Sequence, residues 1–305
     1  MKKLLILWGL VLSLAVLGTG LPEGSFDWSR AKSIASGIRI KKFEYSKPRP
    51  LQIYAVKIDL ANPRIYLVTT SRDKDWGQAM PDYPKMKIET RRTRVYDFMQ
   101  RYRRGGQDMR LAVNASPWSP WTKPFTHQYA GNIGLVVSDG VVVCTPVKRS
   151  VPAFVIRKNG RADMITFKEG DKTDDLKLAV SGFSFVLRDG KNVGGKGQVL
   201  HPRTFYGLSR DGRNFYIVVA DGRQKGFSEG MSLSEGGQFL KYLGADDGIN
   251  MDGGGSTTLV TYDRGRINVE NTPPGSGKVS AKDKHKYTRK VANCIGVCLR
   301  PKQGF

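Results

Sequence analysis

The sequence predicts a β-rich fold of the α+β (mixed α/β) class, in a single domain with many hairpins and a few helices packed on the sheet. The chain has 35 glycines in 305 residues, which favours tight turns over long helices. Four Asx-Gly pairs separate apolar runs and supply the positive φ that two-residue hairpin turns require; they are Asp139-Gly140, Asn159-Gly160, Asp189-Gly190 and Asp211-Gly212. No stretch within residues 40–300 has the composition of a linker.

The apolar pattern predicts the elements in order. Leu51 to Asp59 alternates and Arg64 to Thr70 follows a short turn, so these runs are predicted to form a strand pair. Glu89 to Arg104 has an apolar face and is predicted to be a helix that ends at Gly105-Gly106. The Asx-Gly pairs then predict hairpin strands at 134–137, 141–144, 154–157, 162–167, 183–187, 204–209 and 214–219. The last strand is predicted over Val291 to Leu299.

One helix has clear boundaries in the sequence. Ser232 and Glu235 form an S-x-x-E capping box, and Gly244 stands where the residue after a helix belongs. A strand at 214–220 precedes this helix and a strand at 248–251 follows it. Strand, helix and strand in this order predict a crossover unit whose two strands end at the same edge of the sheet.

The first twenty residues predict an export signal. Two lysines precede an apolar run from Leu4 to Leu17, which is shorter than the ~20 residues that cross a bilayer. Cleavage is expected near Gly20, leaving a periplasmic or extracellular protein without a membrane span; an uncleaved signal would act as an N-terminal membrane anchor. Residues 21–50 show little periodicity and are predicted to be a lead-in segment before a domain at 51–300.

The charge of the chain favours anionic partners. The formal net charge is +23, and removal of Lys2 and Lys3 with the signal leaves +21. Such a field attracts acidic glycans or phosphorylated polymers, although it is equally expected of an exported protein that is simply basic. A specific nucleic-acid partner is not expected, because the basic residues are spread along the chain and no DNA- or RNA-binding motif is present. The oligomeric state is unknown from the sequence.

The cysteines are Cys144, Cys294 and Cys298. Cys294 and Cys298 lie in a strand-like run, where a spacing of four separates their Cα atoms by roughly 13 Å. A disulfide spans at most ~7 Å, so these two should not pair with each other, whereas either could pair with Cys144. No paired CxxC motif is present and the histidines lie far apart, so a zinc site is not expected.

The most informative motif is Asp252-Gly253-Gly254-Gly255-Ser256. Three consecutive glycines indicate a backbone that is approached closely or takes unusual angles. Successive N–H groups in such a turn can form an anion-binding nest, with the Asp252 carboxylate beside it. Taken alone, the motif is better explained by a glycine-rich turn in which Asp252 bonds its own backbone.

A second motif changes the interpretation of the first. Asp221-Gly222-Arg223 follows the apolar strand at 215–220 and would by itself be another turn. Both Asp-Gly turns, however, end strands that flank one helix, at the kind of sheet edge where sites form. Three further candidates have ordinary alternatives: Glu235 is explained by its capping role, Arg203 by a solvated charge and Asn114 by a turn.

Five motifs in order resemble the phosphodiester glycosidase family: His201-Pro202-Arg203-Thr204, Asp221-Gly222-Arg223, Gly230 to Glu235, Leu243-Gly244-Ala245 and Asn250 to Ser256. The resemblance covers roughly residues 51–300. This family includes a lysosomal enzyme that removes N-acetylglucosamine from a phosphate diester on mannose. The resemblance therefore implies a hydrolase, a glycosidase that cleaves the glycosidic bond of a sugar-1-phosphate diester.

The resemblance also implies roles for individual residues. The catalytic candidates are Asp252, Glu235 and Asp221, and the substrate-binding candidates are Asn114, Arg203, Arg223, Gly253, Gly254, Gly255, Ser256, Asn271 and Arg289. The sequence departs from the family in three places: Ala115 to Trp118 follow the early asparagine, Thr288 replaces an acid, and a basic loop runs from Gly275 to Lys286. The sugar preference of the family is therefore not carried over.

The implied mechanism needs cations more than a strong general acid, because phosphate is already a good leaving group. Arg203, Arg223 and Arg289 would hold the phosphate with the glycine nest, Asp252 and Glu235 would take the carboxylate roles, and Asp221 would orient Arg223. No cofactor is required; calcium accepts such acids and Asn as ligands, but no spacing demands it. The rival function is a non-catalytic binding protein for acidic glycans or envelope polymers.

Overall fold

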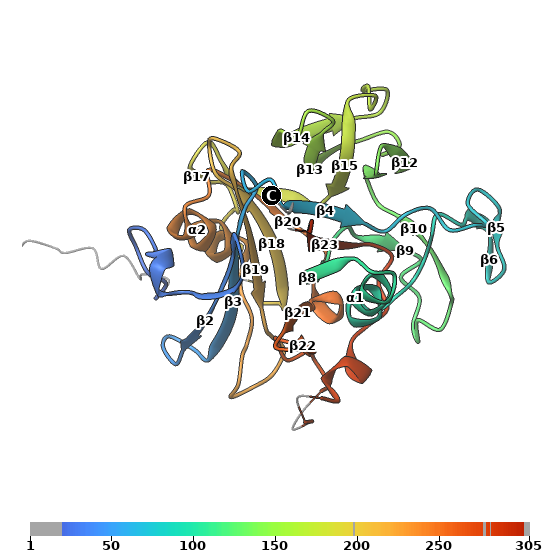
Figure 1. The fold of residues 1–305 in the computed structure, drawn as a ribbon. Coiled ribbons are helices and arrows are strands. Elements are labelled where there is room, and N and C mark those ends of the chain that lie inside the picture. Colours follow the sequence, from blue (N-terminus) through green and yellow to red (C-terminus); the bar gives the residue numbers. More distant parts are fainter. Residues whose placement is uncertain (1–19, 198, 277–278, 281, 302–305) are drawn as a thin grey trace, which may run out of the picture.

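The computed structural model describes residues 20–197, 199–276, 279–280 and 282–301. The predicted β-rich, single-domain α+β class is confirmed. Two large sheets face each other, with helix α2 outside one and helix α1 outside the other (Figure 1). The predicted signal lies outside the described residues apart from Gly20. Across the part of the chain that is described, no helix has the length and apolar character to cross a membrane.

The first sheet carries the elements that position the site. Its strands are paired antiparallel throughout in the order β1 (Lys32–Ala35), β2 (Ile38–Tyr45), β3 (Leu51–Asp59), β19 (Asn214–Ala220), β18 (Arg203–Leu208), β20 (Asp247–Asn250), β16 (Ser184–Arg188) and β17 (Lys191–Asn192). Both faces are buried. In β3, Ile53 packs towards Phe239 of α2 (Leu233–Leu243), while Val56 and Ile58 pack towards the second sheet.

The second sheet has the order β22 (Arg266–Val269), β21 (Leu259–Asp263), β8 (Asp108–Asn114), β23 (Cys294–Leu299) and β4 (Ile65–Thr69). Its outer face is covered by α1 (Val95–Arg104), through Val95, Phe98 and Met99. A third sheet, β12 (Val141–Cys144), β11 (Val136–Ser138), β15 (Leu176–Ser181), β13 (Ser150–Arg157) and β14 (Ala162–Lys168), has its own apolar cluster. Smaller pairings join β7 (Thr90–Arg91), β10 (Tyr129–Asn132) and β9 (Trp118–Ser119), and β5 (Ala79–Met80) with β6 (Tyr83–Lys87).

The predicted hairpins are confirmed, because β11 pairs with β12, β13 with β14, β16 with β17 and β18 with β19, all antiparallel. The predicted strand pair at 51–59 and 64–70 is wrong: both strands exist, but β3 lies in the first sheet and β4 in the second. Their alternating apolar residues meet face to face across the core, as Val56 and Leu67 do, instead of edge to edge.

Two boundaries also differ from the prediction. The helix begins at Val95 instead of Glu89, because the preceding residues pair with β10 and the backbone of Val291. The segment predicted as a lead-in contributes β1 and β2 to the first sheet. The cysteines Cys144, Cys294 and Cys298 are all free, so Cys294 and Cys298 are unpaired as expected and neither bridges to Cys144.

The crossover is confirmed in detail. Ser232 caps α2 in a full capping box with Glu235, and Gly244 ends the helix with φ of 105°. The helix connects β19 to β20, and β18 lies between these two strands, antiparallel to both. β19 and β20 are therefore parallel to each other, and they end at the same edge of the sheet, as predicted.

Candidate active site

Three points of the chain meet at that edge of the first sheet. β19 ends at Ala220, which pairs with Arg203 at the start of β18. β20 ends at Asn250, on the other side of β18. Because the outer two strands run antiparallel to the middle one, Asp221, Asp252 and Arg203 are all delivered to one edge.

Asp252 is held by four hydrogen bonds and is 1% exposed. Its Oδ2 accepts from Nε1 of Trp118 at 3.1 Å, and its Oδ1 accepts from the amide of Gly253 at 2.9 Å. The backbone N–H of Asp252 donates to the carbonyl of Ala115 at 3.0 Å, and its carbonyl accepts from Nδ2 of Asn114 at 2.6 Å. Trp118 and Gly253 thus orient the carboxylate, while β8 and the residue after it hold the backbone of Asp252.

The environment of Asp252 also sets its protonation. Burial raises the pKa of Asp252 to about 6, against the lowering effects of the Ser256 hydroxyl, the Gly253 amide and the charge of Arg289. A carboxyl that titrates near neutral pH can exchange protons with a substrate or water. Its place beside a cation is a second property expected of a reactive acid.

The glycines after Asp252 are required because two guanidinium groups lie directly on their backbone. Gly254 has φ of +62°, and a Cβ there would lie 3.1 Å from Nη1 of Arg223. A Cβ at Gly255 would lie 2.5 Å from Nη2 of Arg289. Any larger residue at Gly255 would displace that guanidinium group, so the glycines give the arginines their place.

The predicted anion-binding nest is wrong for three of its amides. The N–H of Gly253 donates to Asp252, that of Gly254 to the carbonyl of Pro202 at 2.8 Å, and that of Ser256 to the carbonyl of Gly253 at 3.1 Å. The segment folds into a short 3-10 turn, and these three N–H groups donate within the protein. Glycine is present to make room for cations, and these three N–H groups do not bind an anion.

The guanidinium groups of Arg223 and Arg289 lie against this turn. Arg203 lies near Arg223, and its guanidinium donates to the carbonyls of Met231 at 3.2 Å and Val199 at 3.3 Å; these three residues are here called the arginine cluster. The pKa of Arg203 is lowered by burial and by Arg223, and the pKa of Arg289 is lowered by burial and by Arg223, with Asp252 acting in the opposite direction. All three remain charged, since an arginine keeps its proton in proteins. Among the described residues, none of the three has a carboxylate within 4.0 Å in an ion pair.

His201 joins the arginine cluster, although only its motif attracted attention in the sequence. Its Nδ1 lies 3.3 Å from Nη2 of Arg223, and its backbone pairs with Met231. Burial lowers the pKa of His201, and the charges of Arg223 and Arg203 lower it further. The neutral imidazole can therefore accept a hydrogen bond from Arg223 and orient it.

Asp221 is buried but holds a loop. Its carboxylate accepts from the amide of Thr272 at 2.9 and 3.0 Å and from Nδ2 of Asn271 at 3.1 Å. Burial raises the pKa of Asp221 to about 7, against these hydrogen bonds and the charge of Lys284. Lys284 itself donates to the carbonyl of Asn271 at 3.3 Å. The predicted orientation of Arg223 by Asp221 has no contact to support it.

The carboxylate of Glu235 has two sets of hydrogen-bond partners. Its Oε2 accepts from the amide of Ser232 at 2.8 Å within the capping box. Nη2 of Arg49 lies 2.6 Å from both carboxylate oxygens and also donates to the carbonyl of Gly230 at 3.1 Å. Glu235 is 3% exposed. Its carboxylate therefore holds the segment before α2, and its predicted catalytic role remains a prediction.

The two predicted asparagines lie behind the site and are fully buried. Asn114 Oδ1 accepts from Oγ1 of Thr204 at 2.8 Å and from the amide of Thr258 at 3.0 Å. Asn271 Oδ1 accepts from the amide of Leu259 at 2.9 Å. Both side chains join strands that carry the site, and direct contact with a substrate remains a prediction for each.

Sequence reasoning missed an aromatic loop beside Asp252. Trp118, Trp121, Phe125 and His127 contact one another, with Trp118 at the centre. The signal in the sequence was the pair of tryptophans around Ser119-Pro120, but nothing local places them next to a residue that lies 134 positions later in the chain.

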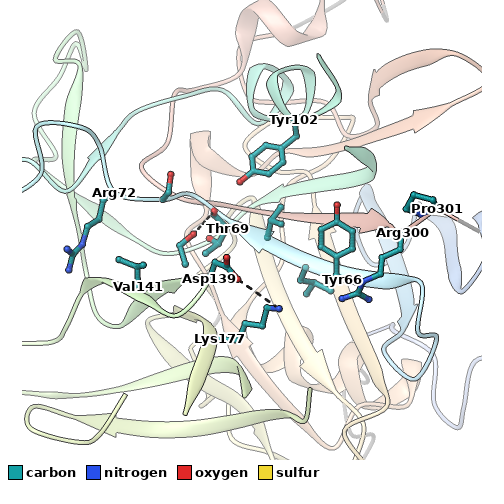
Figure 2. A pocket seen from close by; sticks show the side chains of 13 residues that line it. Tyr66, Thr69, Arg72, Tyr102, Asp139, Val141, Lys177, Arg300 and Pro301 are labelled. Carbon is teal, nitrogen blue, oxygen red and sulfur yellow. Dashed lines mark hydrogen bonds and ion pairs between the residues drawn. The ribbon is translucent and has the colours of Figure 1, made fainter. Parts of the chain in front are cut away.

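A large cavity in the described part of the protein lies elsewhere. It has a volume of about 740 Å³ and is lined by β4, α1, the β11–β12 turn and β15, as Figure 2 shows with Tyr66, Tyr102 and Lys177 around it. None of the predicted site residues lines it. Its one carboxylate, Asp139, is exposed and lies 4.0 Å from Lys177. The buried acid and the unpaired cations both belong to the Asp252 edge, which makes that edge the better candidate site.

In the part of the chain that is described, no three His, Cys, Asp or Glu side chains gather in a group that could hold a metal ion. The fold and the edge together define a class of protein: a β-rich α+β domain with a buried aspartate and an arginine cluster at one edge of its first sheet. The sequence profile of the phosphodiester glycosidase family matches residues 110–298, and the chain belongs to that family.

Solved structures share the fold. The catalytic domain of zebrafish N-acetylglucosamine-1-phosphodiester α-N-acetylglucosaminidase, auto-inhibited by its pro-peptide, is 20% identical, with a TM-score of 0.60 over 90% of this chain and 87% of the other. A hypothetical protein from Synechocystis is 14% identical, with a TM-score of 0.55 over 87% and 62%. A protein inferred to be exported in Burkholderia pseudomallei is 13% identical, with a TM-score of 0.51 over 82% and 74%. No curated protein sequence matches.

Proposed function

We propose that the protein is an exported hydrolase that cleaves the glycosidic C1–O bond of a sugar-1-phosphate diester. The observation that carries this proposal is a buried Asp252 beside three arginines that lack a carboxylate partner in the described part of the chain. An uncompensated cluster of this kind favours a bound anion. Membership of the phosphodiester glycosidase family supports the same substrate class.

The arginine cluster binds the phosphate of the proposed substrate. Guanidinium groups present planar N–H donors that match phosphate oxygens. Arg223 and Arg289 are backed by Gly254 and Gly255, so their positions are set before the substrate binds. Such fixed charges stabilise the negative charge that grows on the phosphate as the C1–O bond breaks.

Asp252 acts at C1 in the proposed reaction. A water oxygen becomes bonded to C1, the C1–O bond breaks, and its electron pair leaves with the phosphate monoester. As a general base, Asp252 takes the proton of the water and the anomeric configuration inverts; as a nucleophile, it forms a glycosyl ester that water then hydrolyses, and the configuration is retained. The anomer that forms first, observed by NMR, distinguishes the two roles.

Hydrolysis in ¹⁸O-labelled water tests the proposal. The substrates are methyl diesters of glucose-, N-acetylglucosamine- and mannose-1-phosphate, and mass spectrometry locates the label. We expect the label on the free sugar and none on methyl phosphate, because the C1–O bond breaks. Label on phosphate would identify a P–O phosphodiesterase. Tight binding without turnover across all three diesters would favour the rival binding protein.

Export is part of the proposal. The predicted signal at residues 1–20 supports it, as does the likeness to a protein inferred to be exported. Expression in a bacterial host with the native leader should give a secreted or periplasmic protein whose first residue lies near Leu21, measured by N-terminal sequencing. A full-length chain retained in the membrane fraction would contradict cleavage.

A further inference from the structure

We propose that the exposed indole of Trp121 is a stacking platform for a pyranose ring next to the phosphate of the substrate. This inference rests on the proposed function and adds a sugar subsite to the phosphate site. A lone surface tryptophan needs no function. Trp121 differs, because it contacts both Trp118, which bonds Asp252, and Arg289 of the arginine cluster.

The first contact of Trp121 connects it, through Trp118, to Asp252, the acid of the proposed reaction. Trp121 is 54% exposed, and its ring centroid lies 5.9 Å from that of Trp118 at an interplanar angle of 35°. Trp118 is fully buried and donates its indole N–H to Asp252. A single buried indole therefore separates the exposed side chain of Trp121 from the carboxylate.

The second contact of Trp121 connects it to Arg289, which belongs to the proposed phosphate site. Cζ of Arg289 lies 5.5 Å from the ring centroid of Trp121 and 4.5 Å from that of Phe125. On its other side, the same guanidinium lies against the backbone of Gly255. An anion bound to Arg289 is therefore placed beside the platform.

A buried arginine holds these groups together. Arg92 is 4% exposed and donates to the carbonyls of Phe125 at 3.0 Å and His127 at 2.7 Å, both in the aromatic loop. It also donates to the carbonyl of Lys290, the neighbour of Arg289, at 3.1 Å. Burial lowers the pKa of Arg92 to about 10, and the charge of Arg289 lowers it further. The platform and Arg289 are thus parts of one fixed unit.

The chemistry of an exposed indole indicates which kind of ligand the platform would bind. A pyranose ring presents a face of C–H groups and an edge of hydroxyl groups, so it can stack on an indole while its hydroxyl groups stay hydrated. Flat aromatic surfaces with a few polar groups beside them are typical of small-molecule sites. The ring that occupies Trp121 comes either from the sugar attacked at C1 or from a sugar in the leaving group.

Steady-state kinetics of Trp121→Ala tests the platform against two substrates. One is the methyl diester of N-acetylglucosamine-1-phosphate, which has a sugar only at C1; the other carries a second sugar in the leaving group. We expect KM to rise about tenfold with kcat within about threefold. A rise for both substrates assigns the platform to the C1 sugar, and a rise for the second alone assigns it to the leaving-group sugar. An unchanged KM for both overturns the proposal.

Two variants serve as controls. Trp121→Phe keeps an aromatic face and should restore most of the affinity. Trp76 is also exposed, at 42%, and is covered by Arg72 at 3.6 Å, but it lies outside the aromatic loop; Trp76→Ala should leave KM unchanged. Inhibition by inorganic phosphate should be unaltered in Trp121→Ala, because phosphate contacts the arginine cluster alone. A weakened phosphate effect would show that Arg289 had moved and would overturn the stacking role.

The stacking role of Trp121 can be tested even if the protein is not a hydrolase. If the wild-type protein hydrolyses no diester, calorimetry with N-acetylglucosamine-1-phosphate and with inorganic phosphate replaces kinetics. A Kd for the sugar phosphate that rises about tenfold in Trp121→Ala, with an unchanged Kd for phosphate, supports the platform. Equal affinity of the variant and the wild type for the sugar phosphate overturns it.

Discussion

The two Asp-Gly turns of the first sheet differ in what their carboxylates contact. Asp221 and Asp252 both follow strands that end at the same edge, both are buried, and burial raises the pKa of each. The carboxylate of Asp221 is occupied by Thr272 and Asn271 and so fixes a loop. That of Asp252 is oriented by Trp118 and lies near Arg289.

The difference shows that burial and a raised pKa do not by themselves identify a reactive acid. The contacts of each carboxylate distinguish them: one backbone amide, that of Thr272, and the side chain of Asn271 make the Asp221 carboxylate a structural anchor. Asp252 also accepts from a backbone amide, that of Gly253, but it lies near an arginine cluster that forms no ion pair with a carboxylate in the described residues. These surroundings suit Asp252 to the role that we propose for it. The same criterion places Glu235 with Asp221, because Arg49 and the capping box already use it.

The largest expected effect is the loss of activity in Asp252→Asn. Asn keeps the shape and one acceptor for Trp118, but it can neither take a proton nor attack C1. We expect diester hydrolysis to fall about 10³-fold, with the folded state preserved by circular dichroism.

The matched variant is Asp221→Asn, which should lose a hydrogen bond to Thr272 or Asn271. Its free energy of unfolding should fall by about 1–3 kcal/mol in urea titrations, while activity at low temperature falls less than tenfold. If Asp221→Asn is as inactive as Asp252→Asn, the contrast between the two turns is wrong.

The variant Glu235→Gln tests whether the Glu235 carboxylate stabilises the fold, as we expect of Asp221, or takes part in the reaction, as we expect of Asp252. The change leaves Arg49 without its ion-pair partner, and the two side chains are 16% and 5% exposed. We expect the free energy of unfolding to fall by about 3 kcal/mol, with kcat retained within about tenfold below the transition. Asp139→Asn, which removes an exposed ion pair, should have almost no effect. A stable but inactive Glu235→Gln would show that Glu235 takes part in the reaction.

Gly255→Ala tests whether glycine makes room for a cation. The added Cβ would lie 2.5 Å from Nη2 of Arg289 and should displace it. We expect kcat/KM to fall about 10²-fold, and inhibition by inorganic phosphate should weaken in parallel. Gly197→Ala is the control, because no heavy atom lies within 4 Å of a Cβ at Gly197. Equal phosphate inhibition in Gly255→Ala and the wild type would argue against this role.

The smallest expected effect is a pH trend in stability. The folded-state pKa of Asp252, about 6, exceeds the unfolded value of ~3.9. Between these values the folded state binds more protons, so the contribution of Asp252 to stability falls as pH rises. The Tm of Asp252→Asn relative to wild type should therefore increase from pH 4 to pH 7 in thermal scans. For Asp221→Asn the same increase should continue to about pH 7.5. A flat difference would show that the carboxyl is not strained by burial.

Local signals explain what the sequence predicted well. The capping box at Ser232 and the Asx-Gly turns depend on neighbours within a few residues, and the crossover then places both Asp-Gly turns at one edge. Long-range contacts explain the misses. β3 and β4 alternate alike, and only the packed core shows that they face each other. The ion pair between Arg49 and Glu235 joins residues 186 positions apart, and no pattern near either predicts it.

The predicted nest is wrong for three of its amides for a different reason. Three glycines are compatible with free N–H groups and with close approach by a side chain, and local sequence does not separate the two. The choice depends on Arg223 and Arg289, which arrive from 31 and 34 residues away in opposite directions along the chain. Only the assembled fold shows that guanidinium groups occupy the space.

The strand order of the first sheet limits how the family's matched segment can be used on its own. That segment begins at residue 110, yet β3 pairs along the whole of β19, and Arg49 comes from the same early part of the chain. A fragment that began at residue 110 would expose the edge of β19 to other chains and would leave Glu235 without its counter-ion. The smallest portable unit for expression or grafting must therefore include the strands from Lys32 onward.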